Sequence, residues 1–131
     1  MHSLIVTTHP ETGSLTHAIA QRIGDAIRAI GAGNTVTHAD LVAEGFDPRF
    51  NRDDQALFRG AGPVPPDVAA EHARLDAIDT LVLVYPLYWW SFPALLKGWI
   101  DRVFTQGWAY QDGADGKVQK KLQRLRVHLV G

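Results

Sequence analysis

Four short runs of apolar and β-branched residues mark the expected strands. SLIVTT at 3–8 and TLVLVY at 80–85 are the strongest. The second run is continuous rather than alternating, which is typical of a parallel strand covered on both faces. Thr35–Ala39 is more polar and predicts an edge strand, and RVHLV at 126–130 predicts a last strand.

Two longer segments show helical spacing of apolar residues. The first follows the first strand, with Ser14 as a plausible N-cap and Gly31 and Gly33 as its stop. The second follows the third strand, with Pro93 in its first turn and Ser91 near the capping position. Gly98 inside it disfavours a helix by about 1 kcal/mol relative to alanine, so close packing is expected there. The apolar positions are Leu15, Ala18, Ile19, Ile23, Ala26, Ile27 and Ile30 in the first segment, and Phe92, Leu95, Leu96, Trp99, Ile100, Val103 and Phe104 in the second.

The middle of the chain, residues 41–66, is rich in glycine and proline and predicts loops. A short helix is expected around Asp53–Arg59, and Asp67 can cap another that runs to about Ala77. Residues 105–117 read as a connection. The resulting order β-α-β-(α)-β-α-β predicts one three-layer α/β domain with a parallel sheet and right-handed crossovers.

Composition limits the classes of protein that this chain can be. With 131 residues, 46% apolar and 21% charged, it is typical of one globular domain. It has no cysteine, which excludes a disulfide scaffold, a thiolate metal site and a cysteine nucleophile. A net charge of −1 gives no reason to expect nucleic acid or a membrane surface. No apolar stretch is long enough for a bilayer, and MHSLIVTTHP does not resemble a signal peptide, so a cytoplasmic location is expected.

The loop after the first strand is a candidate anion site. It joins a strand to a helix N-terminus, where free N–H groups and the helix dipole favour negative charge. Thr12, Ser14 and Thr16 add hydroxyl donors, and His9 adds an imidazole. The loop matches neither a P-loop nor a Rossmann fingerprint, and a capped helix without a ligand is the alternative.

The loop after the third strand, residues 86–93, is a candidate ring-binding site. It carries Tyr88, Trp89 and Trp90, and all four tryptophans lie between Trp89 and Trp108. This crowding indicates either a flat apolar ligand or an aromatic-rich corner of the core. An anion site and an aromatic shelf on one rim together fit a phosphorylated planar cofactor, of which a flavin is the natural candidate.

Three stretches resemble the flavodoxin-like NAD(P)H:quinone oxidoreductases, the DT-diaphorase-like family. THPETGSLTHA is similar to the phosphate loop of that family, HADLVAEGFDPRFNRDD to its second strand and following loop, and DTLVLVYPLYWWSFPALLKGWIDRVFTQGWAY to its flavin loop and signature helix. The resemblance implies a tightly bound FAD or FMN, a homodimer, and hydride transfer from NAD(P)H through the flavin to a quinone or similar small acceptor. The net charge and the lack of a long apolar stretch predict no nucleic-acid partner and no direct membrane insertion.

The resemblance also assigns cofactor-binding residues by position. His9, Ser14, Leu15 and Thr16 would hold the phosphate, and the ring would rest on Pro86, Leu87, Tyr88, Trp89 and Trp90. Tyr88 departs from the small or amide side chain that is often found there. No catalytic side chain is assigned, because hydride chemistry belongs to the cofactor.

The family implies a strand order 2-1-3-4-5, whereas this chain reaches only the end of its fourth strand. We therefore expect residues 1–131 to form a single flavodoxin-like domain, a three-layer sandwich with order 2-1-3-4, C-terminally incomplete because the fifth strand is missing. Two alternative functions stay open at this point. They are an ancillary regulatory subunit of a potassium efflux system and a folded fragment that binds no flavin.

Several other polar residues are expected to be structural. Asp53 and Asp54 read as helix-start acids, and Asp101 and Arg102 as an exposed or dimer-rim pair. The histidines without metal-ligand spacing are expected at the surface or capped, and the basic run before the last strand is expected to be a solvated face or, alternatively, to attract NAD(P)H phosphates. These residues are His17, His38, His72 and His128, and Lys117, Lys120, Lys121, Arg124 and Arg126.

Overall fold

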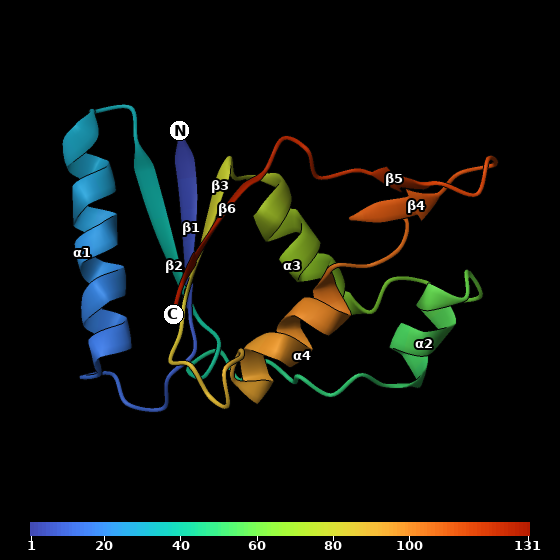
Figure 1. Cartoon of the computed structure of the whole chain (residues 1–131), viewed down its shortest axis with the longest axis horizontal. Coiled ribbons are helices and arrows are strands. Elements are labelled where there is room, and N and C mark those ends of the chain that lie inside the picture. Colours follow the sequence, from blue (N-terminus) through green and yellow to red (C-terminus); the bar gives the residue numbers. More distant parts are fainter.

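The structure is a computed structural model that describes residues 1–131. A central sheet lies between helix α1 on one side and helices α2, α3 and α4 on the other (Figure 1). The elements in chain order are β1 (His2–Thr7), α1 (Leu15–Ile30), β2 (Thr35–Asp40), α2 (Arg52–Phe58), α3 (Pro66–Asp76), β3 (Thr80–Val84), α4 (Ala94–Val103), β4 (Tyr110–Asp112), β5 (Val118–Lys120) and β6 (Arg126–Val130).

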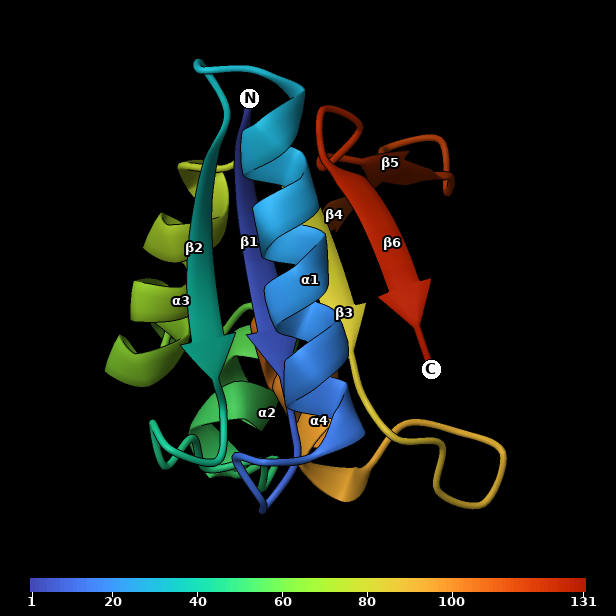
Figure 2. The ribbon, with the colours of Figure 1, turned by 90° about the vertical axis from the view of Figure 1, so that its left-hand side faces the viewer.

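The main sheet has four strands in the order β2-β1-β3-β6, and every pair in it is parallel. All four predicted strands are therefore found, and the predicted order 2-1-3-4 is confirmed (Figure 2). β3 is buried along its whole length, as its continuous apolar run predicts, while β2 is largely exposed, as an edge strand is. None of the helices has the length and apolarity that a bilayer crossing needs.

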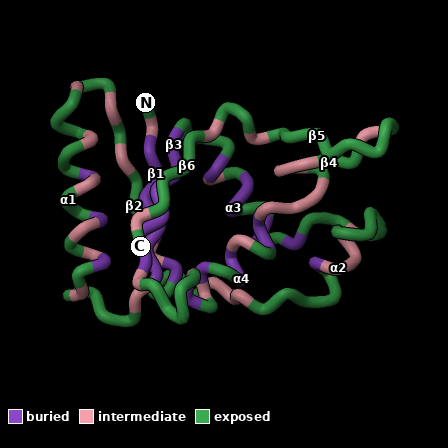
Figure 3. Tube along the Cα trace, in the orientation of Figure 1, coloured by how far each residue is buried: buried purple, intermediate pink, exposed green.

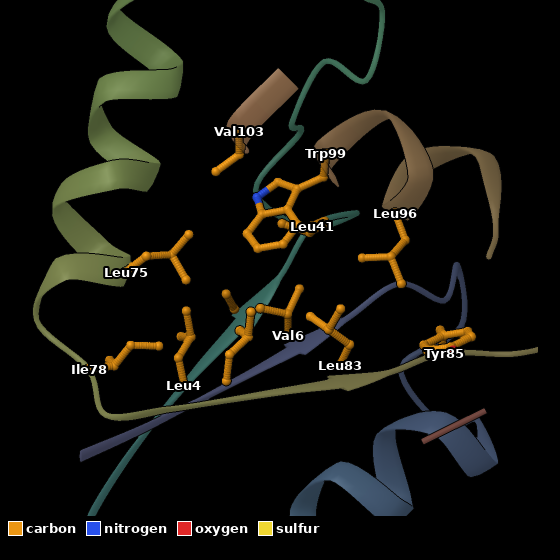
Figure 4. Packing of buried hydrophobic residues seen from close by; sticks show 12 residues of the cluster. Leu4, Val6, Leu41, Leu75, Ile78, Leu83, Tyr85, Leu96, Trp99 and Val103 are labelled. Carbon is orange, nitrogen blue, oxygen red and sulfur yellow. The ribbon is translucent and has the colours of Figure 1, made fainter. Parts of the chain in front are cut away.

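The core has one part on each face of the sheet. The larger part lies between the sheet and helices α3 and α4, where Trp99 and Leu96 pack against strand side chains such as Leu4 and Leu83 (Figure 4). The smaller part holds Ile5 and Val82 against α1. The face of α1 that points away from the sheet is mostly exposed (Figure 3). The prediction for Gly98 is confirmed, since a Cβ there would overlap the carbonyl oxygen and the Cβ of Pro48.

Arg102 corrects one sequence-based expectation. The sequence predicts an exposed or dimer-rim position for it, yet only 2% of its side chain is accessible within the single chain. Its Nε lies 2.9 Å from the Asp54 carboxylate, and it donates to the Asp47 carbonyl at 2.9 Å. Arg102 Nη1–H also donates to a second carboxylate, that of Asp67, at 2.5 Å, and this hydrogen bond lowers the pKa of Asp67. Helix α2 and the preceding loop fold over the polar side of α4, which periodicity within α4 cannot reveal.

Two predicted helix caps are also wrong. Asp67 does not cap α3, because the helix already begins at Pro66 and Asp67 lies inside its first turn. The Asp67 carboxylate accepts from the Val68 backbone N–H and from Arg102. Ser91 does not cap α4, which begins at Ala94 after Pro93. The expected acidic start of α2 is confirmed, with Asp54 closing a capping box on Asn51.

The segment after α4 holds more structure than predicted. Residues 110–120 form the antiparallel hairpin β4-β5 rather than an irregular connection. Part of the basic run packs against the protein, since Arg124 donates to the Ile78 carbonyl at 2.9 Å. Of the two positions expected for His72, at the surface or capped, the surface position is wrong, since His72 is buried and its Nε2 lies 2.7 Å from the Val103 carbonyl oxygen.

Candidate functional site

Two loops meet at the end of the sheet where the strands finish. One joins β1 to α1 and the other joins β3 to α4, and both lie beyond the arrowheads of neighbouring strands (Figure 2). The carboxyl ends of strands in open parallel sheets are where ligands bind. The fold therefore brings the two predicted loops to one rim.

The β1–α1 loop presents an uncommitted set of hydrogen-bond donors. Ser14 is the N-cap of α1, as predicted, and its Oγ accepts from the His17 backbone N–H at 3.3 Å. The backbone N–H groups of Thr12, Gly13, Leu15 and Thr16 make no hydrogen bond within the protein. The first turn of α1 contains no acidic residue. This donor set fits a phosphate group.

His9 adds a side-chain donor to the same loop. Its Nδ1 accepts from the Glu11 backbone N–H at 3.0 Å. A neutral imidazole that accepts at Nδ1 carries its proton on Nε2, so His9 keeps one N–H donor for a ligand. The charge of the ring is not needed for this role.

A cavity of about 230 Å³ joins residues from the two loops. His9, Leu15 and Thr16 line it from one loop and Pro86 from the other, with Val130 at the end of β6 beside them. Four of the predicted cofactor-binding residues therefore share one cavity. Ser14 lines a neighbouring hollow of about 460 Å³ on the β2 side of α1.

The β3–α4 loop is built around a tight turn with tryptophan at both central positions. Tyr88 and Ser91 exchange backbone hydrogen bonds of 3.1 Å in both directions. Between them, Trp89 and Trp90 have φ values of 49° and 61°. Two-residue turns of this kind favour Asn and Gly, because left-handed backbone disfavours other residues by about 1–2 kcal/mol each. Strain of this kind is concentrated at functional sites.

The turn displays its tryptophans instead of burying them. Each of the two side chains is 87% exposed, and their rings lie 5.7 Å apart at 63°. Together with Leu87 they line an open hollow of about 440 Å³. Tyr88 lines none of these hollows, and its backbone closes the turn. Exposed indole faces in a strained turn are suited to stacking on a flat ligand.

The other two tryptophans are structural. Trp99 is fully buried, and its Nε1 donates to Glu71 at 3.1 Å. Burial raises the pKa of Glu71 despite this hydrogen bond. Trp108 stacks on His72 with ring centroids 4.0 Å apart. The predicted aromatic-rich corner of the core is therefore found for one pair, Trp99 and Trp108, whereas the other pair is exposed at the surface.

A chain of hydrogen bonds beside the anion loop was not predicted from the sequence. Ser14 Oγ lies 3.0 Å from His17 Nδ1, and His17 Nε2 lies 3.0 Å from the Asp40 carboxylate. The sequence predicts a surface or capped position for His17, because it has no metal-ligand spacing. The available signal was its place three residues after a capping serine, opposite the end of the neighbouring strand β2.

The chain matches the family model described as "Flavodoxin-like fold" over residues 1–131, and it belongs to that family. It is 41% identical over 110 residues to the uncharacterized NAD(P)H oxidoreductase YcaK of Escherichia coli (strain K12), a match that covers 83% of this chain and 55% of that protein. It is 33% identical over 124 residues to NAD(P)H dehydrogenase [quinone] 1 of Rattus norvegicus, covering 82% of this chain and 44% of the rat protein. The chain thus spans about half the length of these curated relatives.

Solved structures agree with this assignment. The NAD(P)H:quinone oxidoreductase of Methanothermobacter marburgensis matches with a TM-score of 0.87 and 28% identity, over 98% of this chain and 64% of that one. General stress protein 14 of Treponema denticola, solved in complex with FMN, matches with a TM-score of 0.55 and 29% identity, over 98% of this chain and 62% of that one.

Proposed function

We propose that this chain carries the flavin site of an NAD(P)H-dependent oxidoreductase that reduces quinones or similar small acceptors by two-electron hydride transfer. The observation that carries the proposal is the strained Trp89-Trp90 turn, which displays two indole rings on the rim that also holds the unpartnered donors of the β1–α1 loop. The names of the relatives support the same activity, and they favour it over an efflux subunit.

Each loop would hold one part of the cofactor. The phosphate would be bound by the hydroxyls of Ser14 and Thr16, the Nε2–H of His9 and the free backbone N–H groups at the start of α1. The ring would rest against Trp89 and Trp90, with Leu87 beside them and Pro86 shaping the shared cavity. Stacking on an aromatic side chain contributes about 1–3 kcal/mol per ring.

The flavin itself would accept the hydride from NAD(P)H and pass it to the acceptor. The chain's own contribution is to orient the ring and to keep the phosphate anchored, and no side chain here is assigned to acid–base catalysis. The proposed cofactor is FAD or FMN, and the titrations described below distinguish them. The FMN complex of the Treponema denticola protein supports FMN.

We further propose a homodimer in the cytoplasm. The exposed Leu87, Trp89 and Trp90 form an apolar surface of the kind that a second subunit covers. The fold does not depend on disulfides, since the chain has no cysteine, and this suits a reducing compartment.

The direct test is to purify the protein and record its visible flavin absorbance, then release and identify the cofactor. Titration of the flavin-free protein with FMN and with FAD gives both affinities. NADH and NADPH oxidation is then followed with a quinone as acceptor. Stoichiometric flavin and quinone-dependent oxidation are expected. A folded protein that binds neither FMN nor FAD would contradict the proposal and favour the flavin-free alternative.

A further inference from the structure

The hydrogen-bond chain Ser14–His17–Asp40 controls what the Ser14 hydroxyl can do. The Asp40 carboxylate has no hydrogen to donate, so it can only accept, and its other oxygen already accepts from the backbone N–H groups of Val42 and Ala43 at 3.0 and 3.2 Å. His17 Nε2, 3.0 Å from that carboxylate, must therefore carry a proton. In a neutral imidazole, Nδ1 is then an acceptor.

When His17 is neutral, the hydrogen of the Ser14 hydroxyl is not available to a ligand. Ser14 Oγ already accepts from the His17 backbone N–H. Its single hydrogen is the only one available to bond His17 Nδ1, 3.0 Å away. Ser14 then presents lone pairs, and no donor, to an anion at the start of α1.

Protonation of His17 reverses this hydrogen bond. An imidazolium donates from Nδ1 to Ser14 Oγ, so the serine hydrogen turns outward and can bond a phosphate oxygen. We propose that His17 and Asp40 are positioning residues that make phosphate binding at this loop proton-coupled, so that one proton from solvent goes to His17 Nδ1 as the anion binds. The inference rests on the proposed function, in that the phosphate is that of the flavin.

The other charged and titratable groups near His17 do not replace this chain. His9 meets the His17 ring edge-on at 6.4 Å between centroids, and it has an Nε2–H donor while neutral. His38 lines the same hollow from β2, and burial together with nearby Arg28 lowers its pKa, which keeps it neutral. No further acid or base lines that hollow. Asp40 is the carboxylate that fixes the tautomer.

The test measures FMN affinity and proton uptake between pH 7 and pH 9, with FAD in parallel. Calorimetry at pH 8 in buffers of different ionisation enthalpy gives the protons bound per FMN. Above pH 7 the phosphate monoester is mostly a dianion, because its second pKa is about 6. Proton uptake and an affinity that falls by up to about tenfold per pH unit are expected. Riboflavin, which has the ring without the phosphate, should bind with no such dependence.

Asp40→Asn is the decisive variant. The two backbone N–H groups hold the amide oxygen where Oδ1 now lies, so the amide NH₂ faces His17 and donates to Nε2. Neutral His17 then carries its proton on Nδ1 and frees the Ser14 hydroxyl without any uptake. FMN binding should lose its pH dependence and its proton uptake while affinity at pH 8 is retained or improved. His38→Gln, in the same hollow, should keep the dependence.

Ser14→Ala gives an independent measurement if Asp40→Asn does not fold. With the hydroxyl removed, FMN should bind more weakly at pH 7 and without proton uptake. Persistence of the full pH dependence in Ser14→Ala would mean that His17 acts by charge alone, and would overturn the inference.

FMN binding by the original protein without proton uptake would also overturn the inference and leave the proposed function intact. If no flavin binds at any pH, the proposed function fails, and titration with inorganic phosphate at pH 6 and pH 8 decides the inference. Proton-coupled phosphate binding supports it, and no binding or uncoupled binding overturns it.

Discussion

Tyr88 and Ser91 hold each other by two backbone hydrogen bonds of 3.1 Å, and this closure forces Trp89 and Trp90 into left-handed backbone. The most exposed aromatic side chains therefore occupy positions that Asn and Gly fit best. A turn selected only for stability would carry those residues. The tryptophans fit a site where ring binding offsets backbone strain.

Replacing Trp89 with Asn and Trp90 with Gly should separate stability from binding. The substituted turn relieves about 1–2 kcal/mol of strain at each position, less the extra conformational entropy that Gly loses on folding, so the free energy of unfolding should rise by at least about 1 kcal/mol. Flavin affinity should fall about tenfold or more, because about 1–3 kcal/mol of stacking is lost. Denaturant titration and flavin titration measure the two quantities. The matched control replaces both tryptophans with Phe, which keeps rings and strain. If the Asn-Gly variant binds flavin normally, the shelf has no role in binding.

Ser14→Asp tests the phosphate loop by charge. Aspartate is as good an N-cap as serine, so α1 should stay intact. A carboxylate among the free N–H groups should repel a phosphate and compete for its donors, so we expect flavin to be lost while the melting temperature of the flavin-free protein is unchanged. Ser14→Asn caps equally well without the charge and should retain more flavin. Normal flavin occupancy in Ser14→Asp would place the phosphate elsewhere.

The buried guanidinium of Arg102 should be a major determinant of stability. Arg102→Met leaves the buried Asp54 carboxylate without its cationic partner, and breaking a buried ion pair destabilises proteins by about 3–5 kcal/mol. Lys97→Met is the matched control on the same helix, because Lys97 and Asp101 form an exposed pair worth at most about 1 kcal/mol. Equal losses in the two variants, measured by denaturant titration, would contradict the structural role of the Arg102 cluster.

Acid should weaken the same cluster. The Arg102 hydrogen bond lowers the pKa of Asp67 in the folded state. A lowered folded pKa contributes stability above the unfolded pKa of about 3.9, and this stability is lost as pH falls through the folded value. The melting temperature should therefore drop below about pH 4, and Asp67→Asn should show a shallower drop. Parallel pH curves for the two proteins would mean that Asp67 does not contribute.

The strands and the two long helices could be predicted because their patterns are local. Continuous apolar runs placed β1 and β3 in the centre of the sheet, and the composition of β2 placed it at the edge. The role of Arg102 was missed because its partners, Asp54 and Asp67, come from segments 48 and 35 residues away.

The site, like the fold, could be predicted only where its signals are local. The aromatic loop and the capping serine are visible as composition and spacing. Both loops lie at one rim because the parallel strands β1 and β3 end on the same side of the sheet. The Ser14–His17–Asp40 chain needs the pairing of β1 with β2, which brings the end of β2 beside the start of α1. The strain at Trp89 and Trp90 is a property of backbone angles that the residue types themselves disfavour.

The free edge of β6 should govern how this chain behaves in solution. β6 pairs only with β3, so its other edge offers unpaired N–H and C=O groups. Val127 and Leu129 of this edge strand are also 49% and 56% exposed. Edges of this kind pair with other chains. We expect the 131-residue chain to self-associate through this edge. We also expect it to bind flavin weakly, because the end of β6 lines the shared cavity.

Leu129→Lys should reduce association by placing a charge on the edge strand, whereas Ile30→Lys, at the far end of α1 and 78% exposed, should not. Sedimentation velocity measures association, and flavin titration measures binding. A monodisperse monomer with stoichiometric flavin would show that the edge is protected and that the site is complete without further strands.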